Sequence, residues 1–181
     1  MLTEICEKDQ AVKLIDFARI FGHQIAITAG MDYADGQCMV IIDGDLQDPP
    51  ELIPEMIKIW RSGYDVVYGK RKTRQGETFF KKFTAKIFYR ILRALTDINI
   101  PVDTGDFRLI DRRVSEALKQ LPERSRYVRG LMSWVGFKQT AIEFERSERF
   151  AGETKYPLKK MLKLAMDGIM SFSYKPLKFA S

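Results

Sequence analysis

The sequence has few of the residues that mark disulfide-bonded, secreted or membrane-spanning proteins. Its 181 residues include only two cysteines, Cys6 and Cys38, which provide no disulfide framework and favour a reducing compartment. No stretch approaches the run of about 18 apolar residues that a membrane-spanning helix needs. The N-terminus also lacks the basic, apolar and small-residue layout of a secretory signal. We therefore expect a chain that folds around its own core and does not itself cross a membrane.

The composition is that of a basic globular protein. Hydrophobic residues make up 45% of the chain, as in proteins with a packed core. Lysine and arginine number 30 against 24 acidic residues, which gives a net charge of +6 and a pI near 9.3. An excess of positive charge favours an anionic partner, which could be a phosphate, a lipid headgroup or a nucleic acid.

Apolar periodicity predicts alternating helices and strands, and hence an α/β fold with mostly parallel strands covered by helices. We expect a single unit over residues 1–150, followed by a basic amphipathic segment over 151–181 that either lies against an anionic membrane surface or docks on the protein as an ordinary helix. In such sheets, ligands bind beyond the carboxyl ends of the strands. The expected elements are the end of a helix at 2–8, a strand at 12–18, a helix at 22–34, a strand at 38–42, a helix at 51–61 and a strand at 64–69.

Two carboxylates directly follow the apolar strand at 38–42. In extended backbone, side chains two residues apart point the same way, so Asp43 and Asp45 can converge on one cation. Mg²⁺ is commonly held by one or two carboxylates together with substrate phosphates. However, Asp-Gly-Asp before two prolines is also ordinary turn chemistry, so this motif alone leaves both interpretations open.

A strongly basic segment follows the strand at 64–69. Residues 70–93 contain nine basic side chains against the single acid Glu77. Those in a helix expected from about residue 78 form one charged stripe, which for most of its lysines predicts a solvated face. Arg71 and Arg74 precede that helix, and the planar guanidinium group binds phosphate through two parallel hydrogen bonds. They are therefore the candidate phosphate ligands.

Three segments in order, at 43–51, 64–71 and 105–109, resemble the signature of family 2 glycosyltransferases that act on polyprenyl phosphates. The resemblance is nearest to bactoprenol glucosyltransferases and dolichyl-phosphate mannose synthases, and it runs from about Val12 to the last residue. It implies a GT-A-like, Rossmann-like sheet. It also implies metal-dependent, inverting transfer of a sugar from a nucleoside-diphosphate sugar, such as UDP-glucose, to a polyprenyl phosphate.

The resemblance also assigns roles to individual residues. It implies that Mg²⁺ or Mn²⁺ is held by Asp43, Asp45 and Gln47, with Asp43 also contacting the donor. It places Arg71 on the lipid phosphate, with Arg74 as a weaker candidate. The expected catalytic residues are Asp45, Arg71 and Asp106.

Three further residues allow more than one interpretation. Asp106 matches a family position near the reacting sugar, but it could equally cap the loop in which we expect it to lie. His23, the only histidine, stands at a helix start, where we expect a capping or packing role. Arg129 belongs to a basic and aromatic patch that is either an acceptor-facing helix or a surface helix packed through its arginine stems.

The chain departs from the family pattern at both ends. Relatives open with a strand carrying Tyr-Asn-Glu and a second strand ending in Asp-Asp-Gly-Ser, neither of which is present, and they usually have Asn where Ile20 stands. They also continue beyond the C-terminal residue into transmembrane helices. We therefore expect a partial GT-A domain, peripheral at the cytoplasmic face of the membrane, with weak or absent activity alone. A family-like homo-oligomer is compatible with this expectation.

Two other functions are compatible with parts of the sequence. A non-catalytic remnant could bind a membrane surface or a sister subunit through its basic helices. A nucleic-acid binder is suggested by charge alone, and we expect no such partner because the basic residues cluster beside a carboxylate pair. The sequence leaves the identity of the sugar and the length of the lipid open.

Overall fold

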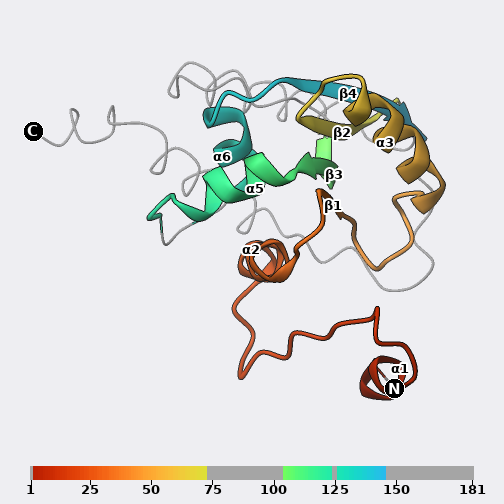
Figure 1. Ribbon diagram of the computed structural model, residues 1–181, viewed down its shortest axis with the longest axis vertical. Helices are drawn as coiled ribbons and strands as arrows, with labels where there is room; N and C mark the ends of the chain where they lie inside the picture. The colour runs from red at the N-terminus through yellow and green to blue at the C-terminus, as the bar shows by residue number, and fades with distance from the viewer. Residues whose placement is uncertain (1, 73–103, 124–125, 146–181) are drawn as a thin grey trace, which may run out of the picture.

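The computed structural model describes residues 2–72, 104–123 and 126–145, which form a sheet covered by helices (Figure 1). The strands of this part of the chain lie in the order β1-β3-β2-β4. β3 is antiparallel to both β1 and β2, whereas β4 is parallel to β2, so β1, β2 and β4 share one direction. The strands are β1 (Cys38–Ile41), β2 (Val66–Arg71), β3 (Thr104–Asp111) and β4 (Gln139–Phe144). The predicted α/β class is confirmed, with β3 as a reversed strand that the sequence pattern did not predict.

Helices cover both faces of this sheet. α3 (Ile53–Arg61) lies on one face, while α2 (His23–Tyr33), α5 (Arg112–Lys119) and α6 (Val128–Trp134) contribute to the core of the other. Neighbouring residues of a strand point to opposite faces, so Val66 belongs to one core and Val67 to the other. The first core contains Met31, Met39, Val66, Ile110, Val114, Leu118, Val128, Leu131 and Met132. The second contains Met56, Val67, Phe107, Leu109, Ile142 and Phe144.

The predicted helix at 51–61 begins with a short 3₁₀ turn, η1 (Pro50–Leu52), that leads into α3. Proline suits this position because the first residues of a helix need no backbone N–H partner within it. The helix ends where Gly63, at φ +99°, donates its backbone N–H to the Trp60 carbonyl at 2.9 Å. In the described part of the chain, no helix has the length and apolar character needed to cross a membrane.

The pairing of β2 with β3 contains an irregularity next to the candidate site. Tyr68 pairs with Arg108, and the next pair is Lys70 with Thr104, so Gly69 alone lies opposite three residues of β3, 105–107. This is a β-bulge, a feature that re-aims side chains and is common beside active sites. A Cβ at Gly69 would lie 2.8 Å from ring atoms of both Phe107 and Phe144. Glycine at this position therefore admits the edge-to-face pair that these two rings form at 5.8 Å.

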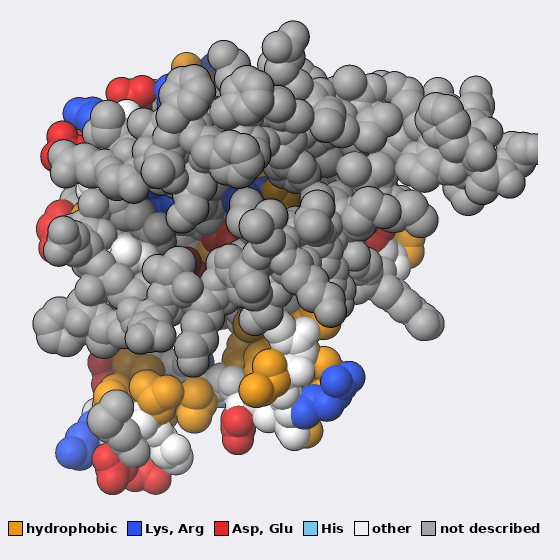
Figure 2. Space-filling model, turned by 180° about the vertical axis from the view of Figure 1, so that it is seen from behind, with side chains coloured by type: hydrophobic (Ala, Val, Ile, Leu, Met, Phe, Trp, Pro, Cys, Tyr) orange, Lys and Arg blue, Asp and Glu red, His pale blue; other side chains and the backbone are white. Residues whose placement is uncertain are grey.

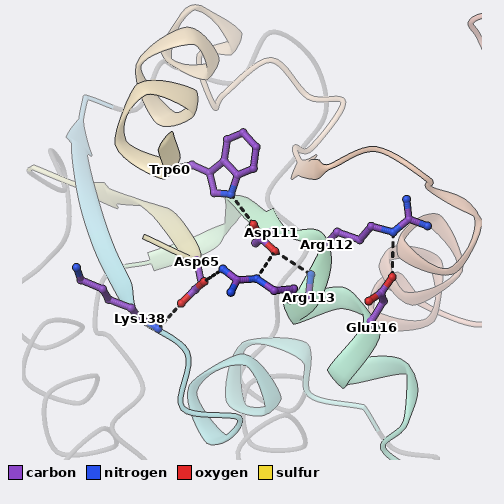
Figure 3. Close-up of polar contacts among 7 residues, drawn as sticks. All are labelled: Trp60, Asp65, Asp111, Arg112, Arg113, Glu116 and Lys138. Carbon is purple, nitrogen blue, oxygen red and sulfur yellow. Dashed lines mark hydrogen bonds and ion pairs between the residues drawn. The ribbon is translucent and has the colours of Figure 1, made fainter. Parts of the chain in front are cut away.

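A polar network fixes the opposite end of the sheet (Figure 3). Arg113 donates from Nη2 to Asp65 at 2.6 Å and from Nε to Asp111 at 3.1 Å. Trp60 donates to the other oxygen of Asp111 at 2.7 Å, which ties α3 to the end of β3. Burial alone would raise the pKa of Asp111, but the bonds from Arg113 and Trp60 outweigh it, so the pKa is lowered.

The N-terminal residues form an arm with little packing. α1 (Leu2–Lys8) is followed by a segment without regular secondary structure that belongs to no sheet of the described residues, so the predicted strand at 12–18 was wrong. A strand needs a partner for its backbone groups, and this segment has none in a ladder. Ile20 is 94% exposed, and Figure 1 shows α1 lying apart from the sheet. Figure 2 shows apolar side chains on the surface of this lower part of the molecule.

Candidate functional site

Residues predicted from three separate motifs meet at one end of the sheet. Asp43 follows the carboxyl end of β1, Arg71 is the last residue of β2, and Asp106 lies near the start of the reversed strand β3. Because β3 runs against its neighbours, its first residues lie beside the carboxyl ends of β1 and β2. This is the end of an α/β sheet at which ligands are expected.

Asp106 is the most buried acid of this cluster, at 8% exposed. Its Oδ2 lies 2.9 Å from His23 Nε2, and its Oδ1 lies 3.1 Å from Arg129 Nε. Burial would raise the pKa of Asp106, but the bond from His23 and the charges of Arg129 and Arg108 lower it, so the carboxylate stays ionised. The expectation of a loop position was wrong, because Asp106 lies within the bulge of β3. The side chains that contact it come from helices α2 and α6, which are far from it along the chain.

His23, the first residue of α2, connects two acids. Its Nε2 lies 2.9 Å from Asp106 and 3.8 Å from Asp43 Oδ1. The hydrogen bond to Asp106 raises the pKa of His23; burial opposes this shift and the negative charges of Asp106 and Asp43 support it. The sequence suggested capping or packing at this position. It could not reveal the pairing, because Asp106 is 83 residues away along the chain.

Three guanidinium groups surround the first residues of β3. Arg108, 4% exposed, donates from Nη2 to the Gly105 carbonyl at 2.8 Å. Burial lowers the pKa of Arg108 to about 10, so it keeps its charge at neutral pH. Arg129 donates to the Thr104 carbonyl at 3.1 Å, and Arg71 Nη2 would lie 3.1 Å from a Cβ built on Gly105. Positive charge therefore exceeds negative charge around this stretch, as suits an anionic ligand.

The proposed metal ligands Asp45 and Gln47 lie in a turn. Asp45 Oδ1 accepts a hydrogen bond from the Gln47 backbone N–H at 3.2 Å, and Leu46 adopts φ 58°. This is the turn chemistry that the sequence left open for Asp45. The side chain of Asp43 is 36% exposed, and its Oδ1 lies 3.8 Å from His23 Nε2. Over the described ranges no group of three or more His, Cys, Asp or Glu could hold a metal.

The residues present nevertheless fit a hard divalent ion of the kind that is held partly by its substrate. Mg²⁺ usually keeps several waters and takes only one or two carboxylates plus phosphate oxygens. Asp43 and Asp45 offer that number of carboxylates within one turn.

Two sequence predictions lie outside the described residues, namely Arg74 and the segment 151–181.

A groove of about 400 Å³ runs between α2 and β1 and ends at this cluster. Apolar side chains such as Ile27, Met31 and Val40 line most of it, whereas His23 and Asp43 supply polar groups. A mostly apolar groove with a few convergent polar groups is the usual form of a small-molecule site.

The fold and the site define an α/β protein with a charged cluster at the ligand-binding end of its sheet, and comparison with known sequences gives the family. The family model described as "Glycosyl transferase family 2" matches residues 1–119. An uncharacterized glycosyltransferase of Bacillus subtilis is 69% identical over 173 residues, which cover 96% of this chain and 54% of that protein. An uncharacterized glycosyltransferase of a Synechocystis species is 51% identical over 98% of this chain and 56% of its own length.

A relative with a more specific name is the prophage bactoprenol glucosyl transferase homolog of Escherichia coli. It is 40% identical over 178 residues, which cover 98% of this chain and 58% of that protein. The chain thus belongs to glycosyl transferase family 2, and it spans about half the length of the curated relatives it matches.

Proposed function

We propose that the chain forms the part of a glycosyltransferase site that brings a nucleoside-diphosphate sugar, such as UDP-glucose, to a polyprenyl phosphate. The observation that carries this proposal is the convergence of Asp43, Asp106 and Arg71 at the ligand-binding end of the sheet. Relatives named bactoprenol glucosyl transferase, at 40% identity, support the polyprenyl acceptor.

The proposed roles follow from charge and position. Asp43 and Asp45, with Gln47, would hold Mg²⁺ or Mn²⁺ against the donor diphosphate. When bound, the ion supplies Lewis-acid stabilisation of the negative charge that grows on the leaving diphosphate. Arg71, with Arg74, would bind the acceptor phosphate through its planar donors.

The acceptor itself makes a strong general base unnecessary. A phosphate monoester has a second pKa of about 6 and is already mostly ionised at neutral pH. Asp106 has a lowered pKa and both its oxygens lie near cations, so it would be a weak base. We therefore assign Asp106 to orientation and electrostatics beside the sugar. Attack from the face opposite the leaving group would invert the anomeric centre.

The test is metal-dependent donor binding. We expect UDP-glucose to bind the chain in the presence of Mn²⁺ and not after chelation, as measured by isothermal titration calorimetry. Asp45→Asn keeps an oxygen that can accept from Gln47 N–H but removes the charge, so it should abolish binding without disturbing the turn. Asp32→Ala, an exposed acid on α2, is the matched control and should bind normally.

The other outcomes separate the remaining functions. Equal binding by Asp45→Asn and the unmodified chain, or no binding by either, would contradict the proposal. Attachment to anionic vesicles without any metal-dependent donor binding would favour a non-catalytic remnant at a membrane surface.

We further propose that sugar transfer takes place at the cytoplasmic face of the membrane. The basic segment 151–181 would then lie against anionic lipid.

A further inference from the structure

Gly105 lies between the guanidinium groups that contact the first residues of β3, and one of them, that of Arg71, lies close to the position of its missing side chain. A Cβ at this position would lie 3.1 Å from Nη2 and 4.0 Å from Cζ of Arg71. The Phe107 backbone nitrogen would lie 3.9 Å from that Cβ, which is an ordinary van der Waals distance. A side chain at residue 105 would therefore be in tight contact with the guanidinium group of Arg71, which would have to shift by a few tenths of an ångström.

Backbone conformation gives no other reason for glycine here. The described glycines with positive φ are Gly22, Gly63 and Gly136, and Gly105 is not among them. Its φ is therefore open to any residue, and the steric demand comes from the arginine alone.

The bulge lies at the place where the arginine and Gly105 meet. Gly69 lies opposite residues 105–107, so the register of β2 and β3 shifts just before Arg71. The extra residues belong to β3, and a bulged strand bends, so the bend lies in the backbone at Gly105. Gly105 lies at the point where the guanidinium group of Arg71 approaches β3.

The other two arginines hold this stretch of β3 in place. Arg108 bonds the Gly105 carbonyl at 2.8 Å, and Arg129 bonds the Thr104 carbonyl at 3.1 Å. The β3 backbone that Arg71 approaches is therefore anchored at the Thr104 carbonyl and at the Gly105 carbonyl. A planar guanidinium group binds phosphate well only when its plane is correctly aimed, so a fixed seat gives the ligand a defined position.

We propose that Gly105 is a positioning residue that seats Arg71 for the phosphate of the acceptor. The inference rests on the proposed function, in which Arg71 binds that phosphate. A methyl group at residue 105 would press on the guanidinium at 3.1 Å, a distance at which the neighbour must give by a few tenths of an ångström. The change would weaken acceptor binding through Arg71 and leave donor binding unaltered.

A double-mutant cycle tests this with farnesyl phosphate, a short polyprenyl monophosphate, as the ligand in calorimetry. We expect Gly105→Ala to bind it roughly tenfold more weakly, as for side chains in contact. In the Arg71→Ala background, the same change should have no further effect. Mn²⁺-dependent binding of UDP-glucose should be the same in Gly105→Ala and the unmodified chain. If Gly105 affected only the overall stability of the chain, Gly105→Ala would weaken the binding of both ligands.

The control is Glu116→Gln, on the exposed surface of α5, where Glu116 pairs with Arg112. It should bind farnesyl phosphate as the unmodified chain does. Additive losses from the two substitutions, or normal binding by Gly105→Ala, would overturn the inference.

Failure of the proposed function is distinguishable from failure of the inference. If the unmodified chain does not bind farnesyl phosphate, the proposed acceptor is wrong. The same four variants, compared by the midpoint of urea unfolding, then test whether Gly105 and Arg71 are in contact. Gly105→Ala should lower the midpoint when Arg71 is present and should not lower it in the Arg71→Ala background. Equal lowering in both backgrounds would show that Gly105 does not seat Arg71.

Discussion

The contact between His23 and Asp106 is the most direct test of the site at the scale of single residues. The hydrogen bond between them, 2.9 Å long, raises the pKa of His23 above its usual 6.5. Because this is the only histidine in the sequence, its ring protons give unambiguous NMR signals. We expect a titration midpoint above 6.5 in the unmodified chain and a clear fall in Asp106→Asn, which removes the largest cause of the shift.

The sign of the stability effect follows from the raised pKa. Protonated His23 contributes stability that is fully present below pH 6.5 and is lost as the pH rises through the folded-state pKa. Asp43→Asn is the control, because its carboxylate is 3.8 Å away and should lower the midpoint less than Asp106→Asn does. A wild-type midpoint at or below 6.5 would contradict the pairing.

At this scale, the sequence identified charged residues better than it identified their partners. Asp43, Arg71 and Asp106 were named from their motifs and do lie at one end of the sheet. His23 was expected to cap or pack, and Arg129 could not be distinguished from a surface arginine. Their roles depend on contacts between α2, β3 and α6, and such contacts leave no local pattern in the chain.

At the scale of elements, Gly69 shows how one glycine permits the packing of β2, β3 and β4. A methyl group there would meet Phe107 and Phe144 at 2.8 Å, so Gly69→Ala should force the aromatic pair apart. We expect it to lower the free energy of unfolding by about 1–3 kcal/mol, the usual cost of overpacking, in urea titrations. Gly30→Ala, in a helix with open space, should instead raise it by about 0.5–1 kcal/mol.

The joint between β3 and α5 gives a second prediction for an element. Asp111 caps α5 by accepting from the Arg113 backbone N–H at 2.9 Å, and it also binds Trp60. We expect Asp111→Ala to lower the free energy of unfolding by about 0.5–2 kcal/mol at pH 7, followed by tryptophan fluorescence. The lowered pKa means that this contribution is present above pH 3.8 and is lost as the pH falls through the folded-state value.

The matched control lies in the same close-up. Glu116 pairs with Arg112 at 2.9 Å on the surface of α5, and such exposed i,i+4 pairs contribute about 0.3–0.5 kcal/mol. Glu116→Gln should therefore cost less than Asp111→Ala at pH 7. If the two cost the same, the network of Figure 3 does not hold the sheet together as described.

Elements with a strong local pattern were predictable, whereas their arrangement was not. The helix at 51–61 has an apolar face and a glycine stop, and it was found with nearly the predicted bounds. The strand at 12–18 has a suitable apolar composition but no ladder among the described residues. The place of β3 between β1 and β2 joins segments far apart in the chain, for which periodicity gives no signal.

At the scale of the whole molecule, the described residues divide into a packed sheet with its helices and an N-terminal arm. The arm carries several exposed apolar side chains, such as Leu14 at 47% and Ile20 at 94%. Segments with few buried contacts open at low free-energy cost, and proteases cut them first. We therefore expect trypsin to cleave after Lys13 and Arg19 before it cleaves after Arg61, which lies in the last turn of α3.

Mass spectrometry of a time course would order these cuts, and hydrogen exchange would report the same difference at the backbone. Amides of residues 13–21 should exchange within the dead time, while those of β2 and β3, each paired on both sides, should be the slowest of the described strands. Exposed apolar side chains on one arm also favour association between molecules, so the order of cleavage should be measured at several concentrations. Protection of Lys13 and Arg19 that holds at the lowest concentration would contradict the arm's exposure, because a single molecule would then be packing it against its own surface.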